Sequence, residues 1–200
     1  LNEECKLYSE INDYSRQTYE ANFAYTKLIK DIKSVKKSEI SNKIPNHDIL
    51  LAGFPCQPFS RAGISKRNNL NIAHGFKDKK QGDLFFNILE VLIIKKPKAF
   101  ILENVQHLEN YSNGEVLDEI LSCLRKYYYV PDPKILDAQD FGLAQRRRRI
   151  YIIGFLDKKD EFKYPEPTFK KVKVRDFLDK DFDKKYIISD KLWQSHRERK

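Results

Sequence analysis

The sequence contains few cysteines, few glycines and no methionine. Its three cysteines, Cys5, Cys56 and Cys123, are scattered without a CxxC pair, which excludes a disulfide framework and a cysteine zinc site and indicates a reducing cytoplasm. No apolar run approaches the roughly 20 residues of a membrane span, and the first residues do not resemble a signal peptide. We therefore expect no membrane association and no metal. An intact protein normally carries an initiator methionine, so the start at Leu1 predicts a fragment.

Positive charge is abundant by contrast. The 38 lysines and arginines against 29 aspartates and glutamates leave a net charge of +9. Such an excess is typical of proteins that bind an acidic partner, such as nucleic acid or an anionic surface. A lysine-rich surface that serves only solubility is the alternative, and net charge alone does not separate the two.

Strand-like and helix-like segments alternate along the chain. Short apolar runs next to turn residues predict strands at 6–10, 29–32, 49–54, 99–102, 127–136 and 150–155. Apolar residues at helical spacing predict helices at 13–23, 83–95 and 115–126. This alternation predicts an α/β fold with a Rossmann-like, mostly parallel sheet and helices on both faces.

Two segments do not follow this pattern. Residues 61–81 are polar and contain two glycines, which predicts a long functional or mobile loop. Beyond residue 158 the chain is charged and weakly patterned. We therefore predict one domain at 1–157, and a linker with the start of another unit at 158–200.

The tripeptide Pro55-Cys56-Gln57 follows the apolar run 49–54 directly. The carboxyl ends of strands are the edge at which α/β folds bind ligands. A thiol there is placed to act as a nucleophile. The alternative is a buried structural thiol, because free cysteine is among the most buried residue types.

Two carboxylates also stand at predicted strand ends. Glu10 closes the first strand, where nucleotide-binding α/β folds place an acid that accepts hydrogen bonds from ribose hydroxyls. A solvated glutamate before a helix is an equally good interpretation of Glu10. Glu103 follows four apolar residues, a costly position for a carboxylate unless it is paired or used. Asn104 beside it could anchor the turn by hydrogen bonds to the backbone.

Four arginines, Arg146 to Arg149, precede the last predicted strand. Such a run is usually solvated or faces phosphate. If strand alternation extends backwards, Arg147 and Arg149 share one face and the other two share the opposite face. Because the run enters a core strand, we expect some of these guanidinium groups near Cys56 and Glu103.

Taken together, these segments resemble the DNA cytosine-5 methyltransferase family. The resemblance rests on four blocks in the family's order and approximate spacing, Ser9 to Ile11, Gly53 to Ser60, Leu102 to Val105 and Gln145 to Arg149, and on the helix 14–23. It implies S-adenosylmethionine as methyl donor and a flipped cytosine of double-stranded DNA as acceptor, with transfer to C5 through a covalent Cys–C6 adduct. It also implies an enzyme of a bacterial restriction-modification system, located in the bacterial cytoplasm.

The resemblance assigns roles residue by residue. Cys56 is the implied nucleophile, and Glu103 the residue that contacts N3 and the exocyclic amine. Arg147 corresponds to the arginine that holds the base carbonyl oxygen, and Arg149 to the second arginine of that block. Glu10 is the implied ribose ligand, Ile11 packs on adenine and Asp31 accepts from the adenine amine. The implied cofactor positions are Glu10, Ile11, Asp31, Ile32, Phe54, Pro55 and Leu84.

The chain departs from the family pattern in several places. The glycine-rich block that meets the methionine end of the cofactor is absent, as are the late blocks and nearly all of the target recognition domain. The usual Arg-Gly before the helix at residue 84 is Gln81-Gly82 here. Residues 185–193 resemble the segment leading into the recognition domain, or are an exposed linker with one anchoring tryptophan. We therefore expect this segment alone to be inactive, and the full-length protein to be a monomer.

Three alternatives remain. The first is a transfer-RNA cytosine-5 methyltransferase, although that branch usually has a second proline before the cysteine, where this chain has Phe54-Pro55. The second is one subunit of a split enzyme that needs a partner subunit. The third is a non-catalytic, basic nucleic-acid-binding module. The combination of Cys56, Glu103 and Arg147 disfavours that third alternative, because a binding module needs no thiol nucleophile.

Overall fold

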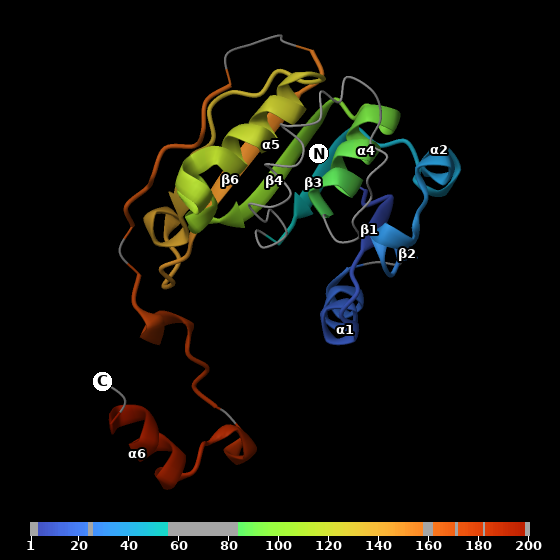
Figure 1. The fold of residues 1–200 in the computed structure, drawn as a ribbon. Coiled ribbons are helices and arrows are strands. Elements are labelled where there is room, and N and C mark those ends of the chain that lie inside the picture. The colour runs from blue at the N-terminus through green and yellow to red at the C-terminus, as the bar shows by residue number, and fades with distance from the viewer. Residues whose placement is uncertain are drawn as a thin grey trace. The chain divides into compact units, whose positions relative to one another are not determined.

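The computed structural model describes residues 4–23, 26–55, 84–157, 162–170, 172–181 and 183–198. The chain divides into two compact units, residues 1–137 with 148–166, and residues 138–147 with 167–200 (Figure 1). Cys56 and the predicted loop 61–81 lie outside the described residues. The domain boundary expected at residue 157 stays a prediction.

The first unit begins with a small parallel sheet. Strand β1 (Leu7–Ser9) pairs with β2 (Lys27–Ile29), and helix α1 (Asp13–Asn22) connects them. Two 3-10 turns, η1 (Ile32–Ser34) and η2 (Lys37–Glu39), and the short helix α2 (Ile40–Lys43) follow. The strand expected at 29–32 thus ends at Ile29, because Asp31 caps η1 instead of continuing the strand.

A four-stranded sheet forms the centre of this unit. Its strands are β3 (Ile49–Gly53), β4 (Ala99–Val105), β5 (Lys134–Asp137) and β6 (Arg148–Phe155), in the order β3-β4-β6-β5. Strands β3 and β4 are parallel, but β6 runs antiparallel to both of its neighbours. The expected α/β fold is confirmed, whereas the mostly parallel sheet is only partly matched. The link between β5 and β6 is too short for the crossover helix that a parallel pair needs.

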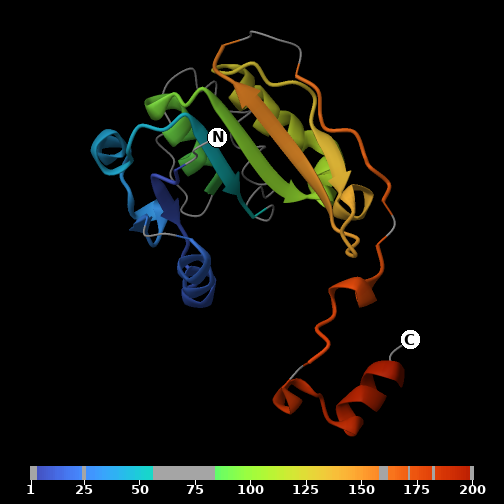
Figure 2. The same cartoon turned by 180° about the vertical axis from the view of Figure 1, so that it is seen from behind.

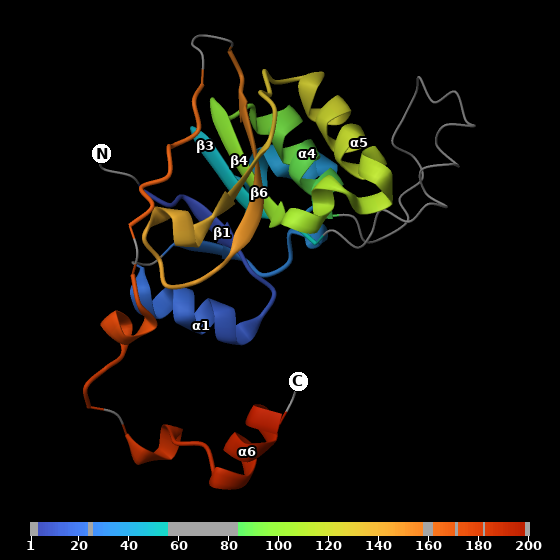
Figure 3. The same cartoon turned by 90° about the vertical axis from the view of Figure 1, so that its left-hand side faces the viewer.

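Helices α4 (Leu84–Lys95) and α5 (Glu115–Arg125) lie on the same face of this sheet (Figures 1 and 3). Alternate strand residues point into the interface; Phe100 and Leu102 of β4 are fully buried, as is Phe85 of α4. Full burial of one such side chain stabilises the fold by about 2–3 kcal/mol. The 3-10 turns η3 (Gln106–Glu109) and η4 (Tyr111–Gly114) lead into α5.

The opposite face of the sheet carries no covering helix in the view from behind (Figure 2). Ile49 and Leu51 of β3 are 55% and 71% exposed there. In the described part of the chain, the expectation of helices on both faces is therefore met on one face only. A second apolar cluster connects the small sheet to the larger one, since Ile29 and Leu50 both pack against a group that includes Ile40 and Val91.

The strand predicted at 127–136 is much shorter in the structure. Tyr129 makes only an isolated bridge to Phe155, and the regular strand begins at Lys134. Pro131 and Pro133 lie between them, and proline cannot donate a ladder hydrogen bond. The strand predicted at 99–102 is longer than expected and continues through Glu103 and Asn104 to Val105.

The second unit contains short helical segments. These are η5 (Ala138–Phe141), η6 (Val174–Phe177), η7 (Lys184–Tyr186) and α6 (Asp190–Glu198). The main-chain amides of Thr168 and Phe169 donate to the carbonyl oxygen of Asp140, at 3.0 and 2.9 Å, and fasten 167–170 to η5. Trp193 in α6 is 54% exposed.

Candidate active site

Glu103 lies near the carboxyl end of β4, between two neighbouring strands. It is opposite Gly53 of β3 and Tyr151 of β6. A Cβ atom added to Gly53 would lie 3.4 Å from Glu103 Oε2, so the carboxylate lies directly beside the β3 backbone. The lack of a side chain at residue 53 therefore leaves room for the carboxylate on this face of the sheet.

Arg149 of β6 binds this carboxylate. Its Nε donates to Glu103 Oε1 at 2.8 Å, and the two side chains are 22% and 35% exposed. The register places Arg149 opposite Val105, two residues along β4 from Glu103, so both side chains project from the same face. The predicted proximity of an arginine of the 146–149 run to Glu103 is confirmed for Arg149. The carboxylate that the sequence marked as costly unless paired is indeed paired.

The other three arginines are arranged differently. Strand β6 begins at Arg148, so the alternation extrapolated backwards to residue 146 does not hold. Arg148 lies near Asp137 on the neighbouring strand, with Nε 3.6 Å from Oδ2. Arg146 and Arg147 belong to the second unit, where the carbonyl oxygen of Arg147 accepts from the amide of Ala138 at 3.2 Å. The implied base-binding role of Arg147 stays a prediction.

Asn104 connects the end of β4 to the chain that leads toward Cys56. It is 3% exposed; its Nδ2 donates to the carbonyl oxygen of Phe54 at 2.7 Å, and its Oδ1 accepts from the amide of Val105 at 2.8 Å. The predicted hydrogen bonding of this side chain to the backbone is confirmed, but Asn104 lies within β4 and not at a turn. The amide fixes the backbone two residues before Cys56, although the thiol itself lies outside the described residues.

The residues on either side of this anchor have different environments. The Phe54 side chain is buried in the core, with its ring 5.7 Å from that of Phe85, whereas Pro55 is exposed. Leu84, the first residue of α4, is partly buried against the same core. The predicted contacts of these residues with the cofactor stay predictions. Only 6% of the Phe54 surface is exposed for such a contact.

The remaining cofactor candidates lie at the carboxyl edge of the small sheet. Because β1 and β2 are parallel, Glu10 after β1 and Asp31 after β2 emerge at the same edge. Glu10 Oε1 accepts from the amide of Asn12 at 2.7 Å, and Asp31 Oδ1 accepts from the amide of Lys33 at 2.9 Å. The side chain of Ile11 is 71% exposed.

This edge suits an adenosine group chemically. A carboxylate can accept several hydrogen bonds, so Glu10 and Asp31 keep acceptor capacity beyond their single main-chain donors. The exposed Ile11 offers an apolar surface for a planar base, whereas Ile32 packs into the cluster beneath. Among the described residues, no group of three or more His, Cys, Asp or Glu side chains is arranged to hold a metal ion.

Residues 2–200 match the model of the C-5 cytosine-specific DNA methylase family. The chain belongs to this family. The type II methyltransferase M.NlaX of Neisseria lactamica is 44% identical over 98% of this chain and 58% of its own length. The type II methyltransferase M.HaeII of Haemophilus aegyptius is 45% identical over 92% of this chain and 54% of its own length. The chain therefore spans about half the length of these curated relatives.

Solved structures agree on the fold. The Spodoptera frugiperda DNMT2 crystal structure superposes with a TM-score of 0.68 at 21% identity, covering 98% of this chain and 59% of that protein. A prophage-encoded DNA modification methyltransferase from E. coli superposes with a TM-score of 0.63 at 22% identity, covering 90% and 50%. The methyltransferase fold expected from the sequence is thereby confirmed. Over the residues that the structure describes, no helix is long and apolar enough to cross a bilayer.

Proposed function

We propose that the protein is a DNA (cytosine-5) methyltransferase of a type II restriction-modification system. It transfers a methyl group from S-adenosylmethionine to C5 of a cytosine flipped out of double-stranded DNA. Family membership over residues 2–200 and the bacterial type II relatives support this activity. Because the proposed substrate is bacterial DNA, we propose that the protein acts in the bacterial cytoplasm. The net charge of +9 favours contact with the phosphate backbone, so binding should weaken as salt rises.

Cys56 supplies the covalent step in this proposal. C5 of cytosine is a poor nucleophile, and addition of the Cys56 thiolate to C6 makes it electron-rich. C5 then takes a methyl group, its proton leaves to a base, and the S–C6 bond breaks to restore both thiolate and aromatic ring. Covalent catalysis of this kind replaces one difficult step with two easier ones. A free cysteine has a pKa of about 8.5, so roughly a few per cent is thiolate at neutral pH.

The pair of Glu103 and Arg149 is the observation that carries the proposal. The ion pair, with an N–O distance of 2.8 Å, holds the carboxylate on the sheet face beside Gly53. The next residue, Asn104, binds the backbone of the segment that leads to Cys56. When protonated, a carboxyl group held there can donate to N3 of a flipped cytosine and accept from its exocyclic amine. This contact withdraws electrons from C6 as the thiolate adds. Arg149 keeps the Glu103 side chain in one orientation, which lowers the cost of ordering it.

The edge after β1 and β2 would hold the cofactor. When bound, S-adenosylmethionine supplies the electrophilic methyl group. Glu10 would accept from the ribose hydroxyls, Ile11 would pack on the adenine face, and Asp31 would accept from the adenine amine. The acceptor capacity of both carboxylates and the exposure of Ile11 support this assignment.

A methyl-transfer assay with the complete protein tests the proposal. Radiolabelled cofactor is supplied with either duplex DNA or transfer RNA, and label in each nucleic acid is counted. We expect label in DNA from the wild type and none from Cys56→Ser. Cys5→Ser is the matched control, because Cys5 is an exposed thiol outside the proposed chemistry, and we expect it to be active.

Other outcomes favour the alternatives. Label in transfer RNA alone would identify an RNA methyltransferase. DNA binding by the wild type with no label in either substrate would favour the non-catalytic module. Gel filtration of the same sample tests the proposed monomer, and activity that requires a second polypeptide would instead indicate a split enzyme.

A further inference from the structure

Arg16 is a buried cation on a helix whose other residues are exposed, apart from the half-buried Tyr19. It is 8% exposed, and no other residue of α1 is buried. A hydrophobic side chain would fill such a position more cheaply, because a buried guanidinium loses its hydration. We therefore expect this arginine to make contacts that an apolar side chain could not make.

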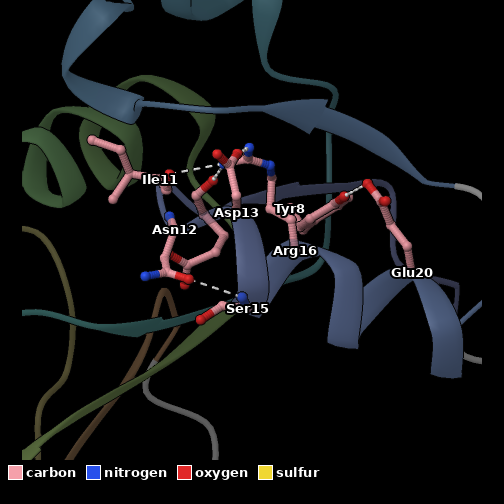
Figure 4. Close-up of polar contacts among 8 residues, drawn as sticks. Tyr8, Ile11, Asn12, Asp13, Ser15, Arg16 and Glu20 are labelled. Atoms are coloured by element: carbon pink, nitrogen blue, oxygen red, sulfur yellow. Dashed lines mark hydrogen bonds and ion pairs between the residues drawn. The ribbon is translucent and has the colours of Figure 1, made fainter.

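The contacts of Arg16 show what the guanidinium does (Figure 4). Its Nη1 donates to the carbonyl oxygen of Glu10 at 3.0 Å and to that of Ile11 at 2.8 Å. Its Nη2 pairs with the carboxylate of Asp13 in the first turn of the same helix. One planar group thus binds two successive carbonyls of the turn between β1 and α1, and its own orientation is fixed by a carboxylate.

Other contacts hold the same turn from its remaining sides. Asn12 caps α1, with its Oδ1 accepting from the amide of Ser15 at 3.0 Å. The amide of Asn12 donates to the carboxylate of Glu10 at 2.7 Å. Three of these bonds reach Glu10 or Ile11, and Figure 4 shows Ile11 and Asn12 beside Arg16. Arg16 therefore binds the backbone from which the Glu10 and Ile11 side chains project.

We infer that Arg16 is a positioning residue for the adenosine end of the cofactor. It acts through Glu10 and Ile11 and does not itself contact the ligand, so the inference rests on the function proposed above. By fixing both carbonyls before the ligand arrives, Arg16 holds the turn in its binding conformation. Pre-organisation of this kind raises affinity because less ordering remains to be done on binding.

Affinity for S-adenosylhomocysteine, measured calorimetrically on the complete protein, tests this role. Arg16→Lys keeps the charge but loses the planar fork that reaches two carbonyls and a carboxylate together. We expect its dissociation constant to rise about tenfold, with a similar rise in KM for the methyl donor. The value of kcat at saturating cofactor and the affinity for duplex DNA should stay near wild type.

Arg125→Lys is the matched control. Arg125 ends α5, where its Nε donates to the carbonyl oxygen of Val130 at 3.2 Å and its Nη2 to Asp132 Oδ1 at 2.9 Å. Its replacement removes the same kinds of contact, to a carbonyl and to a carboxylate, at a position remote in sequence from the turn that carries Glu10. The Arg125 side chain is more exposed than that of Arg16, so we expect a smaller drop in melting temperature for Arg125→Lys, and a change in cofactor affinity only for Arg16→Lys.

A double-mutant cycle with Glu10→Ala separates positioning from general stabilisation. If Arg16 acts through Glu10, replacing it matters much less once the Glu10 carboxylate is gone, so the two effects are not additive. Additive effects, or unchanged affinity in Arg16→Lys, would overturn the positioning role while leaving the proposed function intact. A wild-type protein that does not bind S-adenosylhomocysteine would instead overturn the proposed function and, with it, this inference.

Discussion

Replacement of Asn104 by alanine should both destabilise the protein and impair its chemistry. The substitution removes two hydrogen bonds, to the Phe54 carbonyl at 2.7 Å and from the Val105 amide at 2.8 Å. Asn104 is 3% exposed and Phe54 is 6% exposed, so water does not readily replace the lost amide at the Phe54 end. At roughly 1–2 kcal/mol per bond left unsatisfied, the free energy of unfolding should fall by about 2–4 kcal/mol.

Urea unfolding followed by circular dichroism measures this change, and the transition should shift to lower urea with an unchanged slope. Asn110→Ala is the control, because Asn110 is exposed and its side chain caps neither adjoining helical turn; we expect a change of less than about 0.5 kcal/mol there. Asn104→Asp separates the two bonds, since a carboxylate still accepts from Val105 but cannot donate to Phe54. Both Asn104→Asp and Asn104→Ala should lose methyl-transfer activity, because only the hydrogen bond to Phe54 holds the segment that leads to Cys56.

An Asn104→Ala protein that unfolds within about 0.5 kcal/mol of wild type would contradict the role given to this side chain. Methyl transfer by Asn104→Asp at the wild-type rate would contradict it as well. Either result would mean that the hydrogen bond from Asn104 to Phe54 does not fix the chain before Cys56.

Three further predictions follow from particular contacts. Glu103→Gln should lower methyl transfer by about 100-fold or more in steady-state assays, yet change the unfolding free energy by less than about 1 kcal/mol, because its pair with Arg149 is partly exposed. Gly154→Ala should destabilise the protein by about 2–3 kcal/mol in urea, since the new methyl group would collide with the buried Phe100 ring. Burial raises the pKa of Tyr128 to about 12 from 10.0, so the folded state holds this proton more tightly than the unfolded state. Stability should therefore fall as pH rises from about 10 through 12, and Tyr128→Phe should reduce that slope.

The sequence predicted the contacts of polar site residues that stand next to the apolar residues of a strand. A carboxylate directly after an apolar run, as at Glu103, needs a partner, and the structure supplies Arg149. An asparagine at a strand end is suited to bonding the backbone, as Asn104 does. Both predictions depended only on local sequence and on the general rule that buried polar groups are paired.

Arg16 could not be recognised in this way. Its helix is polar on almost every side, so an arginine in it is expected to be solvated. The burial arises from the two carbonyls of the preceding turn, whose direction is a property of the folded backbone. An aspartate three residues earlier on the helix is the one local signal, and such pairs are common on exposed helices.

The mixed sheet was missed for a related reason. Residue pattern identifies β6 as a buried strand, but the pattern of a strand is the same in either direction. Its antiparallel pairing with β5 follows from the short connection 138–147, and the prolines at 131 and 133 shorten β5. The length of a connection therefore indicates the direction of a strand, which the periodicity of its residues does not.

A covalent bond from Cys56 to C6 of a target cytosine is the decisive step of the proposed function. Its most direct test is peptide mapping by mass spectrometry after the complete protein reacts with duplex DNA containing 5-fluorocytosine and with S-adenosylmethionine. Fluorine at C5 cannot leave as a proton does, so the adduct should be trapped, and we predict a methylated fluorocytosine on the peptide that contains Cys56. An adduct on another residue, or an adduct that survives Cys56→Ser, would contradict the account.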